Sequence, residues 1–367
     1  MSQTDTLTQP RREAGTFTAR RRSRAGALGL LAALLVLAVL ISVCTGAMAI
    51  SLPELAGIVT QQLGMEAAYP FEEHQKIIFW FMRLPRICLG ILIGAGLSVA
   101  GALLQSLFRN PLADPMLIGI SSGATLFAVL AIVLGTFFSG LLGGLLGSYL
   151  LSFAAFMGAC LAILLVYQLS KVNGRSQITT MLLAGIAINA FVNALTGLLI
   201  SMANDEQLRS ITFWGLGSLG GATWTTVLTV LPFIGLTLLY MPRLAKSLNL
   251  LALGESQAAH LGVNTTRLKR QTILLVTLTV GASVAVAGTI GFVGLVIPHI
   301  IRQAFGPHHR LVLSGSALAG AAVLTLADTL SRTLVAPSEL PIGVLTALMG
   351  TPVFVYILLK EKRYTHD

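Results

Sequence analysis

Apolar runs of about 20 residues, the length that an α-helix needs to cross a bilayer, follow one another along the chain with short polar breaks between them. Nine such runs can be placed, at 27–50, 84–108, 115–137, 141–169, 178–202, 225–241, 271–294, 311–331 and 341–359. The pattern predicts an all-α integral membrane protein whose polar residues are confined to tails and loops.

One apolar stretch is too long for a single crossing. It covers 271–305, which as one helix would measure roughly 50 Å against a hydrocarbon core of about 30 Å. Pro298 and the glycines that precede it offer a break. We therefore expect a short return segment near 296–306 to supply a tenth crossing. With ten crossings, the basic N-terminal segment and the basic C-terminal KEKR lie on the same side of the membrane.

Composition agrees with a membrane protein. Hydrophobic residues make up 55% of the 367 residues and charged residues 10%, with a mean hydropathy of +0.83, which excludes a soluble globular domain. We expect a basic, disordered tail at 1–25, a single transmembrane domain at 26–360 and a short cytoplasmic tail at 361–367. The first apolar run exceeds the h-region of a signal peptide, about 7 to 15 residues, so it is predicted to remain as a helix.

Charge follows the ten predicted crossings. Basic residues gather on one side, which the positive-inside rule identifies as the cytoplasmic side of a bacterial inner membrane. Both termini are therefore expected on that side. The net charge of +10 then reflects topology, and no nucleic-acid partner is needed to explain it. The basic residues on that side are the N-terminal arginines, Arg109, Lys171, Arg175, Arg243, Lys246, Arg267, Lys269, Arg270, Arg310, Lys360, Lys362 and Arg363. The acidic residues on the other side are Glu54, Glu66, Glu72, Glu73, Asp205, Glu206 and Glu339.

The polar break RNPLADP at 109–115 contains more charged side chains than a turn requires. Asn-Pro and Asp-Pro start turns, but a turn needs neither Arg109 nor Asp114. The break lies within RLPRICLGILIGAGLSVAGALLQSLFRNPLADPMLIGISSGA at 83–124, which closely resembles the signature of FecCD-type permeases, the membrane subunits of ATP-binding-cassette (ABC) importers for cobalamin, iron siderophores and haem. The resemblance continues through MLLAGIAIN at 181–189, FWGLGSLGGATW at 213–224, LALGESQAAHLGV at 251–263, AGTIGFVGLVIPHIIR at 287–302 and ADTLSRTLVAPSELPIGVLTALMGTPVF at 327–354. It implies the FecCD-type fold, with ten helices in each of two identical subunits that together form one pathway.

The source of energy is predicted to lie outside this chain. No G-x-x-x-x-G-K-[ST] motif occurs, so we expect no enzyme activity and no cofactor or metal here, with ATP and Mg on a separate ABC ATPase dimer. An ion-coupled secondary transporter, the alternative, would place ionisable residues near the bilayer midplane, whereas Asp114 and Asp328 lie toward the ends of apolar runs. An intramembrane enzyme is disfavoured, because His299, His308 and His309 form no recognised catalytic motif.

The longest cytoplasmic insertion, 242–270, is the predicted contact with that ATPase. Its sequence LNLLALGESQAAHLGVN predicts two short helices separated by Gly254, and its apolar residues need a partner surface that a solvated loop would not need. The resemblance implies that this segment docks on the ATPase subunit. The residues assigned to the contact are Leu253, Gly254, Glu255, Ala258 and Gly262.

Three arginines at predicted outer helix ends, Arg83, Arg86 and Arg332, depart from the positive-inside rule. Interfacial snorkelling is one explanation. The resemblance implies another, in which they receive carboxylates of a periplasmic substrate-binding protein, a pairing that the planar guanidinium suits.

The resemblance also implies a cytoplasmic gate made by two turns. Asn110 and Leu112 lie in one, and Ile178 and Thr179 lie in the other, with a static turn as the alternative for each. Scattered polar residues in the run at 178–202 suit a weakly interacting lumen for a large ligand; they are Asn189, Asn193, Thr196 and Ser201. The segments at 213–224 and 254–263 resemble haem permeases most, so haem ranks first as ligand, ferric siderophores second and cobalamin third.

Overall fold

The computed structural model describes residues 13–46, 48–135, 149–172 and 175–364. The helices that precede the first polar turn are α1 (Glu13–Cys44), α2 (Leu52–Gln62), α3 (Glu73–Ile78), the π-helix η1 (Phe79–Arg83) and α4 (Leu84–Phe108). The middle of the chain forms the 3-10 helix η2 (Pro115–Ile118), α5 (Ile120–Val133), α7 (Leu150–Leu169), the two-residue antiparallel strands β1 (Lys171–Val172) and β2 (Arg175–Ser176), α8 (Ile178–Ser201) and α9 (Asp205–Leu216). The remainder forms α10 (Trp224–Leu251), α11 (Glu255–His260), α12 (Thr265–Ala287), α13 (Val293–Phe305), α14 (His309–Thr333) and α15 (Ile342–Tyr364).

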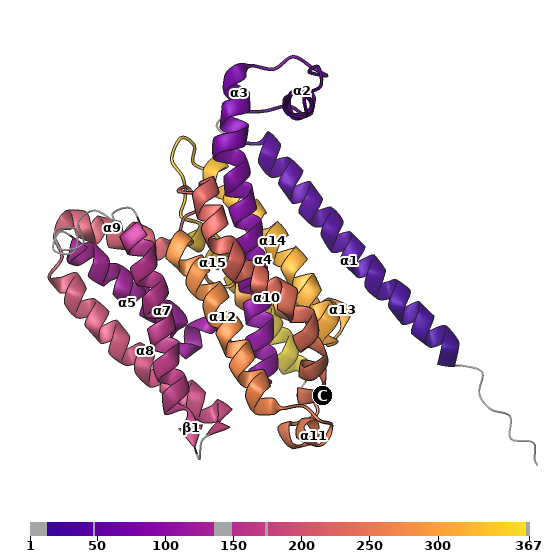
Figure 1. Ribbon diagram of the computed structural model, residues 1–367, viewed down its shortest axis with the longest axis vertical. Coiled ribbons are helices and arrows are strands. Elements are labelled where there is room, and N and C mark those ends of the chain that lie inside the picture. Colours follow the sequence, from indigo (N-terminus) through magenta and orange to yellow (C-terminus); the bar gives the residue numbers. More distant parts are fainter. Residues whose placement is uncertain (1–12, 47, 136–148, 173–174, 365–367) are drawn as a thin grey trace, which may run out of the picture.

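The number of crossings agrees with the sequence prediction. Among the described residues, seven helices are long and apolar enough to span a membrane, and the three shorter apolar helices α5, α13 and α15 bring the total to ten. The predicted return near 296–306 is α13, and the break before it contains Gly288, whose φ of +70° favours glycine. Figure 1 shows that α1 begins and α15 ends at the end of the molecule where α11 lies, with α2 and α3 at the opposite end.

Several predicted boundaries were wrong. Helix α1 starts at Glu13, so 13–25 is helical where a disordered tail was expected, and α15 extends through 361–364. Helix α5 begins at Ile120 because 115–118 is the separate 3-10 helix η2. Residues 1–12, 141–148 and 365–367, which belong to predicted segments, lie outside the described residues.

Helix α10 continues past Pro242, where the predicted crossing ended. A proline removes one backbone donor and normally marks a helix boundary. Here an apolar stripe with helical spacing, Leu244, Ala245, Leu248 and Leu251, is buried against the rest of the chain and holds the last turns in place. The helix therefore carries the chain directly from the membrane to α11.

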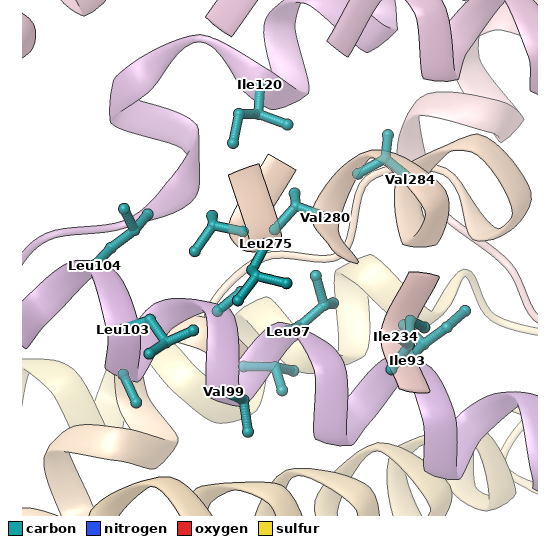
Figure 2. Packing of buried hydrophobic residues seen from close by; sticks show 14 of the residues in the cluster. Ile93, Leu97, Val99, Leu103, Leu104, Ile120, Ile234, Leu275, Val280 and Val284 are labelled. Carbon is teal, nitrogen blue, oxygen red and sulfur yellow. The ribbon is translucent and has the colours of Figure 1, made fainter. Parts of the chain in front are cut away.

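Helix α4 is the centre of the structure. It is flanked by α10, α12, α13 and α14, with α5, α7 and α8 grouped on one side of the molecule and α1 on the other (Figure 1). The close view in Figure 2 shows its side chains Ile93, Leu97 and Leu103 together with Ile234 of α10 and Leu275 of α12. All five are buried, so α4 fixes the positions of the helices around it.

The helix that includes α4 continues outward without a break from Glu73 to Phe108. Pro85 cannot donate a backbone hydrogen bond, and the chain forms the π-helix η1 directly before it. The Trp80 carbonyl, which lies in this π-helix, accepts a hydrogen bond of 2.9 Å from the indole Nε1 of Trp224 at the start of α10. The irregularity thus ties two helices together at the outer end.

Glycines allow the helices around α4 to approach closely. A Cβ atom added to Gly101 would overlap the backbone of Gly294 in α13, and one added to Gly94 would overlap the backbone of Gly320 in α14. Small residues permit such contacts in membrane proteins, where apolar burial between helices gives little driving force and packing must supply the stability.

Replacement of Gly101 by alanine is expected to destabilise the protein, because the new methyl group meets backbone and neither helix can yield by rotating a side chain. The expected loss in unfolding free energy is about 3 kcal/mol, the upper end of the usual cost of overpacking. The control is Gly197→Ala on α8, where an added Cβ would meet no atom within 4 Å. The midpoint of thermal unfolding in detergent measures both, and equal midpoints for the two variants would contradict the close approach.

Candidate functional site

The turn between α4 and α5 is built by the polar residues of RNPLADP. Arg109 ends α4 with a positive φ of +50°. The side chain of Asn110 accepts a hydrogen bond of 2.9 Å from the Leu112 N–H, and that of Asp114 accepts one of 2.7 Å from the Met116 N–H, which starts η2. Burial raises the pKa of the Asp114 carboxyl, and its bond to the Met116 N–H opposes this shift. The amide and the carboxylate therefore give the turn its shape.

This turn is fastened to the middle of α8. The Asn189 amide donates a hydrogen bond of 3.0 Å to the Met116 carbonyl and accepts one from the Ser122 hydroxyl. Gly185 lets the Leu117 carbonyl approach the α8 backbone. Asn189 was expected to face a lumen, and it instead joins the turn to α8. The residues around Asn189 in the sequence do not distinguish it from Asn193, whose side chain is exposed.

The structure positions the four predicted gate residues in two separate places. Asn110 and Leu112 are exposed in the α4–α5 turn, while Ile178 is partly buried and Thr179 exposed at the start of α8. Within the described chain, no hydrogen bond joins one pair to the other. Their joint action as a gate stays a prediction.

An apolar groove starts at this turn. Its volume is about 630 Å³, and it runs from Leu112 past Phe292 to Leu348 of α15. Phe292 has a φ of +66°, which is rare for a bulky residue, and its ring lies where a side chain on Gly350 would be. Apart from Asp114 and Thr289, the lining is apolar side chains and glycine.

Three histidines lie apart from this groove, namely His299, His308 and His309. With Arg109 and Arg302, they line a cavity of about 920 Å³ between the ends of α4, α10 and α13. His309 Nδ1 lies 2.8 Å from the Asn249 side-chain oxygen, and His299 Nε2 lies 3.0 Å from the Gln303 amide nitrogen. In the part of the chain that the structure describes, no three His, Cys, Asp or Glu side chains form a group that could hold a metal ion.

The segment 242–270, predicted to contact an ATPase, contains one separate short helix, α11, which lies between two glycines. Gly254 and Gly262 have φ values of +124° and +84°, so each reverses the chain at one end of α11. Only one separate short helix forms, because the first of the two that were predicted is the end of α10. Leu253 is 60% exposed and Leu261 is 58% exposed, so they form the apolar surface of this segment.

Two residues assigned to the ATPase contact also face inward. Ala258 is fully buried and anchors α11 to the rest of the chain, which corrects its assignment to a partner surface. Glu255 forms an ion pair of 2.6 Å with Lys269 of α12 while its side chain stays 44% exposed. A six-residue helix is too short for its hydrophobic periodicity to indicate which face is buried.

At the end of the molecule where α2 and α3 lie, the three arginines have partners within the chain. Arg86 lies between two carboxylates, with its Nε 3.0 Å from Asp328 and its Nη1 2.7 Å from Glu339. Arg332 donates to the Ser42 carbonyl at 2.8 Å and also faces Asp328, at 3.5 Å. These contacts join α4, α14 and α1.

Arg83 is the most buried of the three, with 5% of its surface exposed. It donates to the carbonyls of Val43 and Met48, beside the end of α1. It lies inside the continuous outer helix and not at a helix end, which corrects the placement expected from the sequence. Glu339 is the exposed member of the cluster, and its hydrogen bonds from Arg86 lower the pKa of its carboxyl. Docking of a binding protein on these arginines stays a prediction.

Comparison with known proteins shows the family of the chain. The model of the FecCD transport family matches residues 34–360. The chain belongs to the FecCD transport family. It is 43% identical to the hemin transport system permease protein HmuU of Yersinia pestis, over 77% of this chain and 83% of that protein. It is 37% identical to the vitamin B12 import system permease protein BtuC of Shigella boydii, over 91% and 94% of the two chains.

A solved structure, described as an inward-facing conformation of a metal-chelate type ABC transporter, has the same fold. It superposes with a TM-score of 0.79 at 32% identity and covers 91% of this chain and 98% of that one. This FecCD protein is thus a multi-pass membrane protein and the permease subunit of an ABC importer. The resemblance on which the sequence interpretation rested is confirmed.

Replacement of Arg86 by methionine is expected to destabilise this FecCD permease, because it leaves Asp328 buried with one fewer cation. The expected loss is about 3 kcal/mol, the low end of the range for breaking a buried pair, since Arg332 still faces Asp328. Arg209→Met on α9 is the matched control, because Arg209 is exposed. Thermal unfolding midpoints in detergent measure both, and a shared midpoint would show that the outer cluster contributes no stability.

Proposed function

We propose that this permease moves haem from the periplasm to the cytoplasm, driven by a separate ABC ATPase dimer that holds ATP and Mg. The observation that carries haem as ligand is the similarity to HmuU, at 43% identity over 77% of the chain. The apolar groove beside the α4–α5 turn supports it. Haem presents two large apolar faces, which such a lining would let pass without a strong binding site.

The proposed pathway requires a second copy of the chain. Helix α8 is mostly exposed, and its apolar side chains Leu183, Ile186 and Phe191 are each about 60% exposed. Leu348, where the groove reaches α15, is also exposed. A homodimer that pairs these surfaces would close the groove of each copy into one pathway, with Leu112 and Thr179 at its cytoplasmic mouth.

The ATPase would bind at α11. Leu253 and Leu261 are exposed apolar residues on a segment that leaves the membrane at the end where basic residues gather, and such residues need a partner. Glu255 adds a partly exposed carboxylate to this surface. This orientation would put both termini on the cytoplasmic side of a bacterial inner membrane.

A periplasmic substrate-binding protein would dock at the opposite end. Of the three arginines assigned to docking, Arg86 is the one whose partner, Glu339, reaches the surface. A carboxylate of the binding protein would exchange with Glu339, while Arg83 and Arg332 would hold the helices beneath.

Ferric siderophores and cobalamin are the alternative ligands, because permeases for them share the fold and 36–37% identity with this chain. An ion-coupled secondary transporter is the more distant alternative. The buried carboxylate of Asp328, on which such coupling would depend, is already paired with two arginines.

Proteoliposomes test the function. They contain the permease with its ATPase, ATP is enclosed, and binding protein loaded with haem, a ferric siderophore or cobalamin is added outside. We expect haem to accumulate only when ATP is enclosed and the ATPase is present. Accumulation without the ATPase under an ion gradient would support the secondary transporter, and accumulation of another ligand in place of haem would overturn the assignment of haem.

The Leu253→Asp variant tests the ATPase contact. A charge at this exposed apolar position is expected to weaken assembly with the ATPase more than tenfold, because loss of a central interface residue costs about 2 kcal/mol or more. Ser256→Asp, an exposed polar position on the same segment, is the control. Co-purification with the ATPase measures assembly, and normal recovery of the Leu253 variant would place the contact elsewhere.

A further inference from the structure

Lys269 is a buried cation near the start of α12. Only 8% of its side chain is exposed. Its Nζ donates 2.6 Å to the Glu255 carboxylate of α11 and 3.1 Å to the Ser176 carbonyl of β2. One ammonium group therefore bridges two segments that are 79 residues apart in the chain (255 minus 176).

The two bridged segments are those with predicted roles in coupling and gating. Glu255 opens α11, the helix proposed to contact the ATPase. Ser176 ends β2, and α8 starts two residues later with Ile178 and Thr179. Only Gln177 separates Ser176 from α8, and this stretch is held against the end of α7, because the Ser176 hydroxyl lies 2.8 Å from that of Ser170 and the Gln177 N–H donates to the Ser170 carbonyl.

We propose that Lys269 is a positioning residue for transport, which transmits displacement of α11 to the start of α8 and so to the cytoplasmic gate. This inference rests on the proposed function, and it adds the physical connection between the ATPase contact and the gate. A buried ammonium suits this role because a buried charge without partners is costly, so Lys269 keeps its bonds to the buried Ser176 carbonyl and to the partly exposed Glu255 carboxylate. Movement of Glu255 draws the ammonium with it, and the Ser176 carbonyl follows.

The test compares Lys269→Met with Arg270→Met in the assembled complex. Methionine keeps the length and apolar stem of lysine and removes both bonds, while Arg270 is an exposed cation on the same helix. We expect Lys269→Met to assemble and hydrolyse ATP while ligand imported per ATP falls about tenfold, within the usual range of coupling between linked sites. Lys269→Arg, which keeps the charge, should recover part of the loss, and Arg270→Met should match the unchanged chain.

A second measurement does not depend on transport. Spin labels at Ser256→Cys in α11 and Val172→Cys in β1, with Cys44, Cys88 and Cys160 replaced by serine, report the distance between the two segments. We expect a distance distribution that ATP leaves unchanged between the labels of one subunit, because the segments move together. With Lys269→Met, ATP should shift or broaden it.

The outcomes separate the two hypotheses. If the unchanged complex imports none of the candidate ligands, the proposed function fails, and the label distances alone then test the link. If the unchanged complex works, and Lys269→Met gives either the same import per ATP or the same distances as the unchanged chain, the role of Lys269 is overturned. A fall in unfolding midpoint with unchanged import per ATP would show that Lys269 only stabilises the fold.

Discussion

The structure depends on one constraint, which is that charged groups buried away from water need partners within the protein. At the outer end, Arg86, Arg332 and Asp328 satisfy one another and join helices from the start and the end of the chain. At the other end, Lys269 satisfies Glu255 and a backbone carbonyl. Between these clusters α4 lies at the centre of a mainly apolar core in which some backbones approach closely, and buried hydroxyls there also form hydrogen bonds, as Thr279 does to Thr237.

This division fits an importer. Paired charges fix the two ends, and three surfaces that a partner could cover are apolar: the groove beside the α4–α5 turn, the exposed face of α8 and the leucines of the α11 segment. A second subunit, an ATPase and a passing ligand are three partners that such surfaces can take. The closely packed α4 is distinct from α11, β2 and the start of α8, which are the elements proposed to respond to an ATPase.

The sequence predicted the repeating features of this fold and missed the long-range ones. Apolar run length and Pro298 were sufficient for the ten crossings, because each crossing is a local property of the chain. The partner of Arg86 lies 242 residues away, and no local pattern indicates such a pairing. Burial of Ala258 and the link from Asn189 to the α4–α5 turn depend on how helices meet, which run length does not specify. The family motifs were sufficient to indicate the family, and only the structure showed which of their residues are buried and which are exposed.

The central claim is that the apolar groove is one wall of the ligand path. Leu348→Cys, in a chain whose natural cysteines are replaced, places a thiol in this groove, and Leu30→Cys places one on the exposed face of α1. The measurement is the rate at which a water-soluble thiol reagent labels each cysteine in the reconstituted complex, with and without ATP and loaded binding protein. Labelling at residue 348 is expected to change with ATP and to slow during ligand transit, while labelling at residue 30 is expected to stay constant. Equal and unchanging rates at the two positions would contradict the claim.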